Sequence, residues 1–364
     1  MTRHLYVHLP FCAHRCGYCD FVTAVGRQEQ HGPYVDALLS ELDLERSLLA
    51  PTLETVFLGG GTPTFTEPHA LERLLTSLPR ADEVTVEANP ETVTQELARM
   101  LRSHGVNRVS LGVQSFRPHL LSVLDRVVHP DTVRRAFYHL RDAGFDNISF
   151  DLIYGIPGQS AADLETDLAD ALELGPEHLS CYELEAKPGT RFTHAHGDEL
   201  ARQADSMETY FEAVVERLTE DGYRWYETAN FCRGGDRDLR SRHNLAYWLG
   251  LDYLGLGVGA VSTFAGRRWR NAPGLSRYLQ ALAKGERPER ELEQLSVEVQ
   301  QQERVMLGLR LDEPLVLGEL AGVLDRDALL RLERLGLVES DARTLALTQR
   351  GRFLGGGVTA DLLA

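Results

Sequence analysis

The feature that most limits the fold of this chain is a sixfold alternation of short β-branched runs with longer helical patterns. The predicted strands are residues 5–9, 55–58, 83–87, 108–113, 147–152 and 179–184. Strands that alternate with helices favour an α/β fold, in which right-handed crossovers join parallel strands. Six units are fewer than the eight that close a full barrel, so this pattern alone leaves a partial barrel and a doubly wound sheet as alternatives.

Amphipathic segments separate the strands, and glycines mark several of their ends. Helices are predicted over 34–48, 91–103, 131–143 and 161–174. Three of them are followed by glycine, in "SHG", "DAG" and "ELG". Glycine is typical of the left-handed residue just past a helix, so these positions indicate where the helices end.

Glycines and polar residues gather at the carboxyl ends of the predicted strands. Three cysteines follow the first strand and "GGGTPT" follows the second. The next three strands end in "EANP", "GVQSF" and "DLIYGIPGQS". Because barrel enzymes carry their active sites at the carboxyl ends of the strands, this placement favours a partial, TIM-like barrel of six units.

The second half of the chain has a different pattern. A helix is predicted near 206–221, and the charged, proline-containing segment 283–294 indicates a boundary. Beyond it, two helices, a third over 326–335 and a hairpin predict a winged-helix-like α+β domain. The predicted domains are a barrel core over 1–200, a barrel extension over 201–285 and the C-terminal domain over 290–364.

The charge of the chain argues against a nucleic-acid partner. The formal net charge is −16, whereas binding to a polyanion needs a concentrated basic surface. From Val297 onward, eight arginines face eleven acidic residues, a net of −3. We therefore expect the winged-helix-like domain to be a lid or a protein-docking surface.

The cellular location is predicted from what the sequence lacks. We find no charged segment followed by an apolar run at the N-terminus and no apolar stretch of spanning length, so we expect neither a signal peptide nor a membrane span. The expected location is the cytoplasm, with peripheral attachment to the inner face of the membrane as an open alternative. In a reducing compartment, closely spaced cysteines indicate metal ligands rather than disulfides.

Three of the five cysteines lie in the stretch "CAHRCGYC", with the spacing C-x3-C-x2-C. Thiolates of Cys12, Cys16 and Cys19 can hold a [4Fe–4S] cluster through three irons and leave the fourth open to another ligand. The alternative is zinc, completed by His14, Asp20 or a distant residue. Structural zinc sites usually pair two C-x2-C knuckles, and this chain has one cysteine cluster, so the spacing favours iron and sulfur.

The same stretch resembles the signature of the radical S-adenosylmethionine (SAM) superfamily, in which an aromatic residue precedes the last cysteine. The resemblance implies that the amino and carboxylate groups of SAM chelate the open iron. One electron from the cluster then cleaves a carbon–sulfur bond, which gives methionine and a 5′-deoxyadenosyl radical. It also implies a core of six strand–helix units, in agreement with the strand count.

Other motifs resemble one branch of this superfamily, the oxygen-independent coproporphyrinogen III oxidase-like proteins. The glycines of "GGGTPT" let a ligand approach the backbone and present free N–H groups, and this loop resembles the one that contacts the amino end of SAM. One departure concerns Arg126, because the branch shows Arg-x-His where "DRVVHP" has an extra residue. The resemblance implies SAM contacts at Tyr6, Gly60, Gly61, Thr62, Glu87, Gln114, Arg126 and Asp151.

The stretch "HNLAYW", residues 243–248, allows two interpretations. One is a core-facing helix start in which Asn244 is hydrogen-bonded. The other is a haem contact, with an imidazole as axial ligand and aromatic rings against the porphyrin. The stretch resembles the H-N-x-x-Y-W motif of a haem-chaperone subgroup of the branch, which implies that His243 contacts haem.

The stretch "GLGVGA", residues 255–260, satisfies the G-x-G-x-x-A dinucleotide fingerprint. That fingerprint needs a helix whose N-terminus holds the pyrophosphate. The residues that follow predict an extended hairpin instead, so we expect a tight turn without a nucleotide.

Two departures separate the chain from the true coproporphyrinogen oxidases. The oxidases carry a further cysteine where this chain has Phe21. They also carry an extension ahead of the cluster, for which the position of Cys12 in this chain leaves no room. The resemblance therefore implies a haem chaperone that binds the cluster, SAM and haem, delivers haem to haemoproteins and needs an electron donor. The oxidase, a radical decarboxylation enzyme, is the alternative, and no catalytic residue is assigned.

Overall fold

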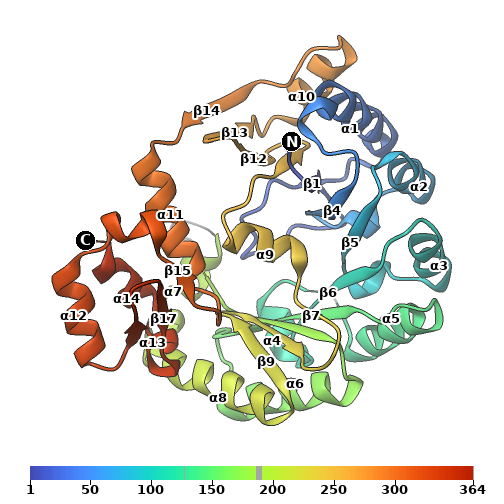
Figure 1. The fold of residues 1–364 in the computed structure, drawn as a ribbon. Helices are drawn as coiled ribbons and strands as arrows, with labels where there is room; N and C mark the ends of the chain where they lie inside the picture. Colours follow the sequence, from blue (N-terminus) through green and yellow to red (C-terminus); the bar gives the residue numbers. More distant parts are fainter. Residues whose placement is uncertain (127, 186–190, 364) are drawn as a thin grey trace.

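The computed structural model describes residues 1–126, 128–185 and 191–363. Its centre is a curved nine-stranded sheet of order β11-β1-β4-β5-β6-β7-β8-β10-β9 (Figure 1). The six strands in the middle of this order pair in parallel, which confirms the partial barrel. They are β1 (His4–Leu9), β4 (Leu53–Gly60), β5 (Ala81–Ala88), β6 (Arg108–Gln114), β7 (Ile148–Tyr154) and β8 (His178–Glu183).

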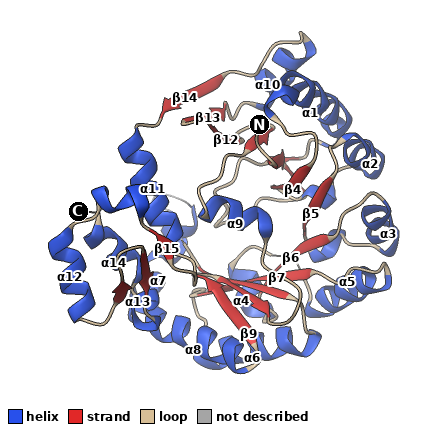
Figure 2. Cartoon of the chain, in the orientation of Figure 1, coloured by secondary structure: helices blue, strands red, loops and turns tan. Residues whose placement is uncertain are grey.

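Helices cover the outer face of these strands, as Figure 2 shows. They are α1 (His31–Glu45), α2 (Pro68–Ser77), α3 (Gln95–Ser103), α5 (Pro130–Asp142) and α6 (Ala161–Leu174), with the short α4 (Pro118–Val123) after β6. Helix α6 begins at a capping box between Ser160 and Asp163 and ends at Gly175, whose φ is 64°. The glycines of "SHG" and "DAG" have φ values of 86° and 89°, as the sequence predicted.

Three strands extend the sheet beyond the predicted six. Strands β9 (Tyr223–Glu227) and β10 (Asn230–Arg233) form a hairpin whose β10 pairs antiparallel with β8. Strand β11 (Leu254–Leu256) pairs in parallel with β1 at the other edge. The short, glycine-rich β11 comes from the "GLGVGA" stretch, which turns directly into β12 (Val261–Phe264) without a helix, so the tight-turn prediction is confirmed.

The barrel extension carries helices and a second sheet. The helices are α7 (Arg191–Gln203), α8 (Met207–Glu220), α9 (Arg242–Trp248) and α10 (Leu275–Ala283). Strand β12 pairs with β13 (Arg267–Asn271), which pairs with β14 (Arg290–Gln294). The charged segment 283–294 therefore ends in a strand of this sheet, and the division into three domains stays a prediction.

The C-terminal part has the predicted winged-helix-like arrangement and its own apolar core, which includes Val305, Leu332 and Leu345. Its strands form a sheet of order β15-β17-β16. Two helices after the hairpin, α13 and α14, were not predicted. The elements are α11 (Val297–Gly308), β15 (Leu315–Val316), α12 (Arg326–Arg334), β16 (Val338–Ser340), β17 (Thr344–Leu347), α13 (Gln349–Phe353) and α14 (Gly355–Leu362).

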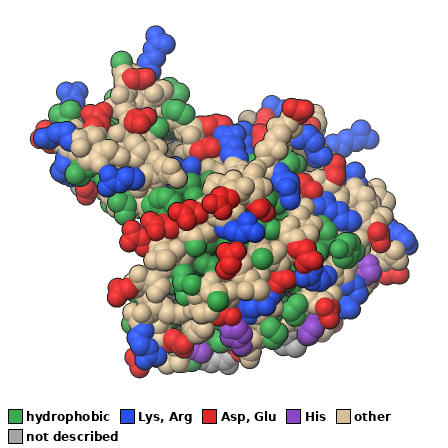
Figure 3. Space-filling model, turned by 90° about the horizontal axis from the view of Figure 1, so that it is seen from below, with side chains coloured by type: hydrophobic (Ala, Val, Ile, Leu, Met, Phe, Trp, Pro, Cys, Tyr) green, Lys and Arg blue, Asp and Glu red, His purple; other side chains and the backbone are tan. Residues whose placement is uncertain are grey.

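The surface mixes both signs of charge (Figure 3). Four exposed glutamates repeat every fourth residue along α8, and the face in Figure 3 shows a row of acidic side chains. The four glutamates of α8 lie on the exposed side of this helix, where a solvated charged face is expected. Within the described residues, no helix combines the length and apolar character needed to cross a membrane.

Candidate functional site

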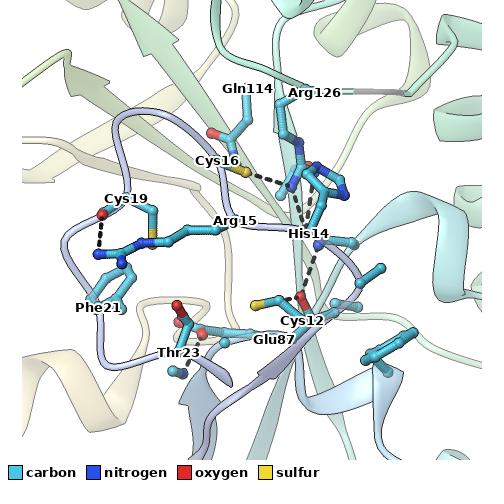
Figure 4. A pocket seen from close by; sticks show the side chains of 18 of the residues that line it. Cys12, His14, Arg15, Cys16, Cys19, Phe21, Thr23, Glu87, Gln114 and Arg126 are labelled. Carbon is cyan, nitrogen blue, oxygen red and sulfur yellow. Dashed lines mark hydrogen bonds between the residues drawn. The ribbon is translucent and has the colours of Figure 1, made fainter. Parts of the chain in front are cut away.

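The cysteine loop lies at the carboxyl ends of the barrel strands. Cys12 ends the short strand β2 (Phe11–Cys12), and the loop returns to β3 (Ala24–Val25), which pairs with β2. Figure 4 shows the sulfur atoms of Cys12, Cys16 and Cys19 on different sides of one opening. All three cysteines are free and partly exposed. The strand pair thus holds both ends of the loop and leaves its thiols facing a cavity.

This cavity, the barrel-mouth cavity, has a volume of about 430 Å³. It brings together ten of the twelve residues that the sequence predicted to bind a cluster, SAM or haem. They are Cys12, Cys16, Cys19, Gly60, Gly61, Thr62, Glu87, Gln114, Arg126 and Asp151. These residues come from five strands and the loops that follow them, so the convergence depends on the parallel barrel.

The glycine loop fits tightly against the start of the cysteine loop. A Cβ atom on Gly61 would lie 2.6 Å from the backbone carbonyl of Pro10, and one on Gly60, whose φ is 112°, would lie 2.5 Å from the His8 ring. The expectation of free N–H groups is wrong, because the N–H groups of Gly61 and Thr62 donate to the carbonyls of Leu9 and Phe11. The glycines are needed for close packing.

Thr62 connects this loop to a cluster ligand. Its hydroxyl donates to Cys12 Sγ over 3.6 Å and accepts a hydrogen bond from Asn89 Nδ2 at 2.9 Å. Burial raises the pKa of the Cys12 thiol to about 11, so the free thiol stays protonated at neutral pH until a metal displaces the proton. Burial also raises the pKa of Cys19.

Two carboxyl groups line the deep wall of the cavity. Glu87 accepts a hydrogen bond from the N–H of Gly60 at 3.0 Å, and Asp151 accepts one from the Ser110 hydroxyl at 3.1 Å. Burial, and next the charge of Asp151, raise the pKa of Glu87 to about 7. Burial raises the pKa of Asp151 to about 6. Once ionised, both groups can accept hydrogen bonds from ribose hydroxyls.

Arg126 lies in the cavity despite the extra residue in its motif. Its guanidinium donates to Asn89 Oδ1 at 3.0 and 3.1 Å and to the carbonyl of Gly112 at 2.9 Å, and Nη1 lies 4.0 Å from Cys16 Sγ. The Nε–H has no acceptor among the described residues. Arg126 is therefore anchored beside Cys16, and its buried Nε–H has no protein acceptor.

Asn89 is a residue that the sequence reasoning did not assign. Its side chain joins Arg126 to Thr62, and thereby connects the guanidinium to the glycine loop. The sequence did contain a signal for Asn89, because this residue belongs to the "EANP" stretch at the end of a predicted strand. Gln114 has a positive φ of 67°, next to a register shift between β6 and β7, and this conformation aims its side chain away from the regular ladder.

Tyr6 and His243 line a different space, the inner chamber. It has a volume of about 220 Å³ and shares Gly60, Glu87 and Asp151 with the barrel-mouth cavity. The Tyr6 hydroxyl lies 3.0 Å from His8 Nδ1, and its ring stacks on Phe57. Tyr6 therefore lies behind the carboxyl groups, one layer deeper in the barrel than the other predicted SAM contacts.

His243 belongs to α9, which packs against the amino-terminal halves of β4 and β5. Its Nδ1 lies 2.7 Å from the Thr55 hydroxyl, its Nε2 lies 2.9 Å from the Tyr247 hydroxyl, and its backbone N–H donates to Glu83. Burial lowers the pKa of His243 to about 3, so the ring is neutral. The backbone N–H of Asn244 donates to the Ser241 hydroxyl, which caps the start of α9. Both ring nitrogens are occupied, and a haem role for His243 stays a prediction.

The donor set fits an iron–sulfur cluster. Three soft thiol ligands come from one short loop beside an open cavity, and soft thiolates suit such clusters. In the described parts of the chain, no group of three or more histidine, cysteine or acidic side chains converges on a single metal ion. His14 and Asp20, the residues considered as further zinc ligands, line the same cavity.

Comparison with known proteins places these features in a family. The sequence pattern of the radical SAM superfamily matches residues 6–171. The chain is 37% identical to the protein named Heme chaperone HemW of Mycobacterium tuberculosis, over 99% of the chain and 94% of that protein. It is 34% identical to the Bacillus subtilis protein of the same name, over 97% of both.

A solved structure is similar over the same length. The Escherichia coli coproporphyrinogen III oxidase HemN, described as a radical SAM enzyme, superimposes with a TM-score of 0.83. The alignment covers 99% of this chain and 90% of that chain, at 25% identity. The similarity extends across the C-terminal part and is not limited to the barrel.

Proposed function

Since the chain belongs to the heme chaperone HemW family of radical SAM proteins, we propose that it binds haem and delivers it to haem-accepting proteins. The observation that carries this proposal is the identity with proteins of that name over nearly the whole chain. Phe21 supports it, because this exposed residue lines the barrel-mouth cavity where the oxidases resembled here carry another cysteine.

The barrel-mouth cavity would hold the cluster and SAM. Cys12, Cys16 and Cys19 supply the thiolates for a [4Fe–4S] cluster. When bound together, cluster and SAM supply reductive cleavage of a carbon–sulfur bond. Of the other residues, Thr62 and Arg126 hold the ligand-bearing loop from either side, and the carboxyl groups of Glu87 and Asp151 can bind ribose.

Haem binding is proposed at helix α9, because "HNLAYW" covers its length. His243 is the residue that the motif resemblance selects. To bind iron, His243 Nε2 would have to leave the Tyr247 hydroxyl. Haem titration of His243→Ala tests this role: weaker binding and an altered Soret band support it, and an unchanged affinity and spectrum remove His243 from the site.

A transfer experiment tests the function. Anaerobically reconstituted protein is loaded with haemin, freed of excess and mixed with apomyoglobin as acceptor, and the Soret band is followed. We expect haem to bind at about one per chain and then to move to the acceptor. Failure to bind haem, or binding without release, contradicts the chaperone.

The similarity to HemN favours one alternative, oxidative decarboxylation of coproporphyrinogen III. Incubation with SAM, a reductant and coproporphyrinogen III under anaerobic conditions separates the two functions. We expect no decarboxylated product, and formation of product at a catalytic rate would establish the oxidase instead.

We propose two further features of the cellular setting. A separate electron donor reduces the cluster, because reductive cleavage of SAM consumes an electron that the cluster must regain. The protein acts in the cytoplasm and reaches membrane-bound haem acceptors from the inner face, without nucleic acid as a partner. Co-purification with membranes and its loss on washing with salt would test the attachment.

A further inference from the structure

A second large cavity lies outside the barrel, between its open side and the C-terminal helices. We name it the outer cavity. It has a volume of about 670 Å³, within the range of sites for small molecules. Much of its wall is aromatic or apolar, from β7, α8, α9, α11, α13 and α14. The residues that matter for the argument are Tyr154, Phe211, Trp248, Arg352, Phe353 and Gly356.

The outer cavity is separated from the inner chamber by the wall of the barrel. Side chains along a strand alternate between two faces. On β8, Ser180 and Tyr182 line the inner chamber, whereas Cys181 and Glu183 line the outer cavity. The same division holds for α9, which therefore contributes to both spaces.

The "HNLAYW" stretch is divided between these spaces. His243 and Tyr247 line the inner chamber and bond to each other, whereas Trp248 lines the outer cavity. The indole N–H of Trp248 has no acceptor within the described chain. An aromatic ring of the motif thus lines the outer cavity, with the Arg310 guanidinium over the ring at 4.6 Å from its centre.

The wall of the outer cavity also holds an arginine that lacks an acidic partner. The Arg352 guanidinium lies 3.6 Å above the centre of the Trp225 ring and donates to the Trp225 carbonyl at 2.9 Å. No described carboxylate lies within ion-pair distance of Arg352, whereas neighbouring Arg310 pairs with Glu227 at 2.6 Å. Burial lowers the pKa of Arg352 to about 10. The carboxylates of Asp312 and Glu227 act on Arg352 only from beyond ion-pair distance, so the partly buried guanidinium has no direct acidic partner and favours an anionic ligand.

We infer that the outer cavity binds haem, with its aromatic walls against the macrocycle and Arg352 paired with a propionate. This inference rests on the proposed function, but it places the haem beside Trp248 on the outer side of α9 and not at His243, which lines the inner chamber. A porphyrin combines a large flat apolar surface with carboxylates at one edge. The outer cavity offers the matching combination: aromatic side chains from four elements and the guanidinium of Arg352, which has no direct ion pair, while Arg310 in the same wall pairs with Glu227 and Glu183 adds one carboxylate.

A filled-cavity variant tests the site. Gly356 lines the outer cavity, and a Cβ atom there meets nothing within 4 Å, so Gly356→Trp places a bulky ring at the wall without backbone conflict. Gly357→Trp is the matched control, because Gly357 has equal space but does not line the cavity. We expect Gly356→Trp to weaken haemin binding by about tenfold or more and Gly357→Trp to change it less than about twofold.

The role of Arg352 is tested with a ligand that lacks the carboxylates. Wild-type protein should bind haemin more tightly than haemin dimethyl ester, by about five- to tenfold. Arg352→Gln should remove this preference and leave binding of the ester unchanged. A preference that persists in Arg352→Gln contradicts the pairing, whatever the absolute affinities.

The outcomes distinguish this inference from the proposed function. If wild-type protein binds no haemin, both fail. If wild-type protein binds haemin, and Gly356→Trp and Arg352→Gln bind it equally well with unchanged circular dichroism, the chaperone function stands and the outer cavity is rejected.

Discussion

The barrel-mouth cavity and the outer cavity are both formed next to β7, but their walls are built differently. The barrel-mouth cavity is lined by strand ends and by backbone that packs at contact distance, as at Gly61 against Pro10. The outer cavity is lined by side chains of helices that belong to different parts of the chain, and Gly356 has open space around it. The comparison indicates that the wall of the barrel-mouth cavity is closely packed at Gly61, whereas the wall of the outer cavity has open space at Gly356.

The largest expected effect is loss of the iron–sulfur cluster in a variant that leaves the outer cavity unchanged. Cys16→Ser should reduce the iron content from about four per chain to less than about one and abolish any spectral response to SAM. Haemin affinity should stay within about twofold, because the outer cavity contains no cluster ligand. Iron and sulfide analysis together with haemin titration measure both. A parallel loss of haem binding would mean that the two sites are one.

The second prediction concerns the closely packed wall. Gly61→Ala should lower the free energy of unfolding by about 2 kcal/mol or more, because its Cβ atom would meet the Pro10 backbone. Gly356→Ala should raise the free energy of unfolding by about 0.5 kcal/mol, since alanine favours the helix and the space is open. Urea denaturation of both variants gives these values. Equal effects of the two substitutions would contradict the difference in packing.

The third prediction uses the carboxyl groups of the barrel-mouth cavity. A folded-state pKa of about 7 for Glu87 means that the native protein holds more protons than the unfolded chain between the usual carboxyl pKa and about pH 7. Stability should therefore fall as the pH rises through this window. Glu87→Gln should remove the part of this slope that Glu87 contributes, leave the part that Asp151 contributes, and gain about 1–3 kcal/mol at pH 8.

The control for this measurement is a carboxyl group outside the cavity. Glu67 caps α2, and hydrogen bonds from the N–H groups of His69 and Ala70 lower its pKa. Its contribution to stability is lost as the pH falls, the opposite direction to Glu87. Thermal melts across the same pH range should therefore show opposite changes in stability relative to the wild type. As the pH rises, Glu87→Gln should become relatively more stable and Glu67→Gln relatively less stable. A change in the same direction for both variants would contradict the burial argument.

The smallest expected effect concerns His243. His243→Gln keeps a hydrogen-bonding side chain in the same space and should cost about 1–2 kcal/mol of stability, because its contacts with Thr55 and Tyr247 are buried. If haem occupies the outer cavity, its affinity for haemin should change by less than about twofold. A loss of tenfold with an altered Soret band would transfer the haem site to the inner chamber.

The two cavities also differ in how far the sequence predicts them. The residues that line the barrel-mouth cavity could be predicted to lie together because each follows a strand, and parallel strands bring their carboxyl ends to one edge. Arg126 lines this cavity even though its motif has an extra residue. The hydrogen bonds of the glycine loop and the bridging role of Asn89 depend on side-chain positions that strand order does not define.

The outer cavity could not be predicted in this way. Trp248 and Arg352 lie far apart in the sequence, and no shared periodicity relates them. They become neighbours of one cavity because β9 and β10 extend the barrel and the C-terminal helices pack beside this extension. The short strands β9, β10 and β11 carry weak patterns, and tertiary pairing defines them.

The most direct measurement for the central claim is electron paramagnetic resonance of the anaerobically reconstituted, reduced protein with and without SAM. Three thiolates beside an open cavity predict a [4Fe–4S] signal whose shape changes when SAM binds the fourth iron. Uptake of zinc in place of iron, or an iron–sulfur signal that SAM leaves unaltered, would contradict the site described here.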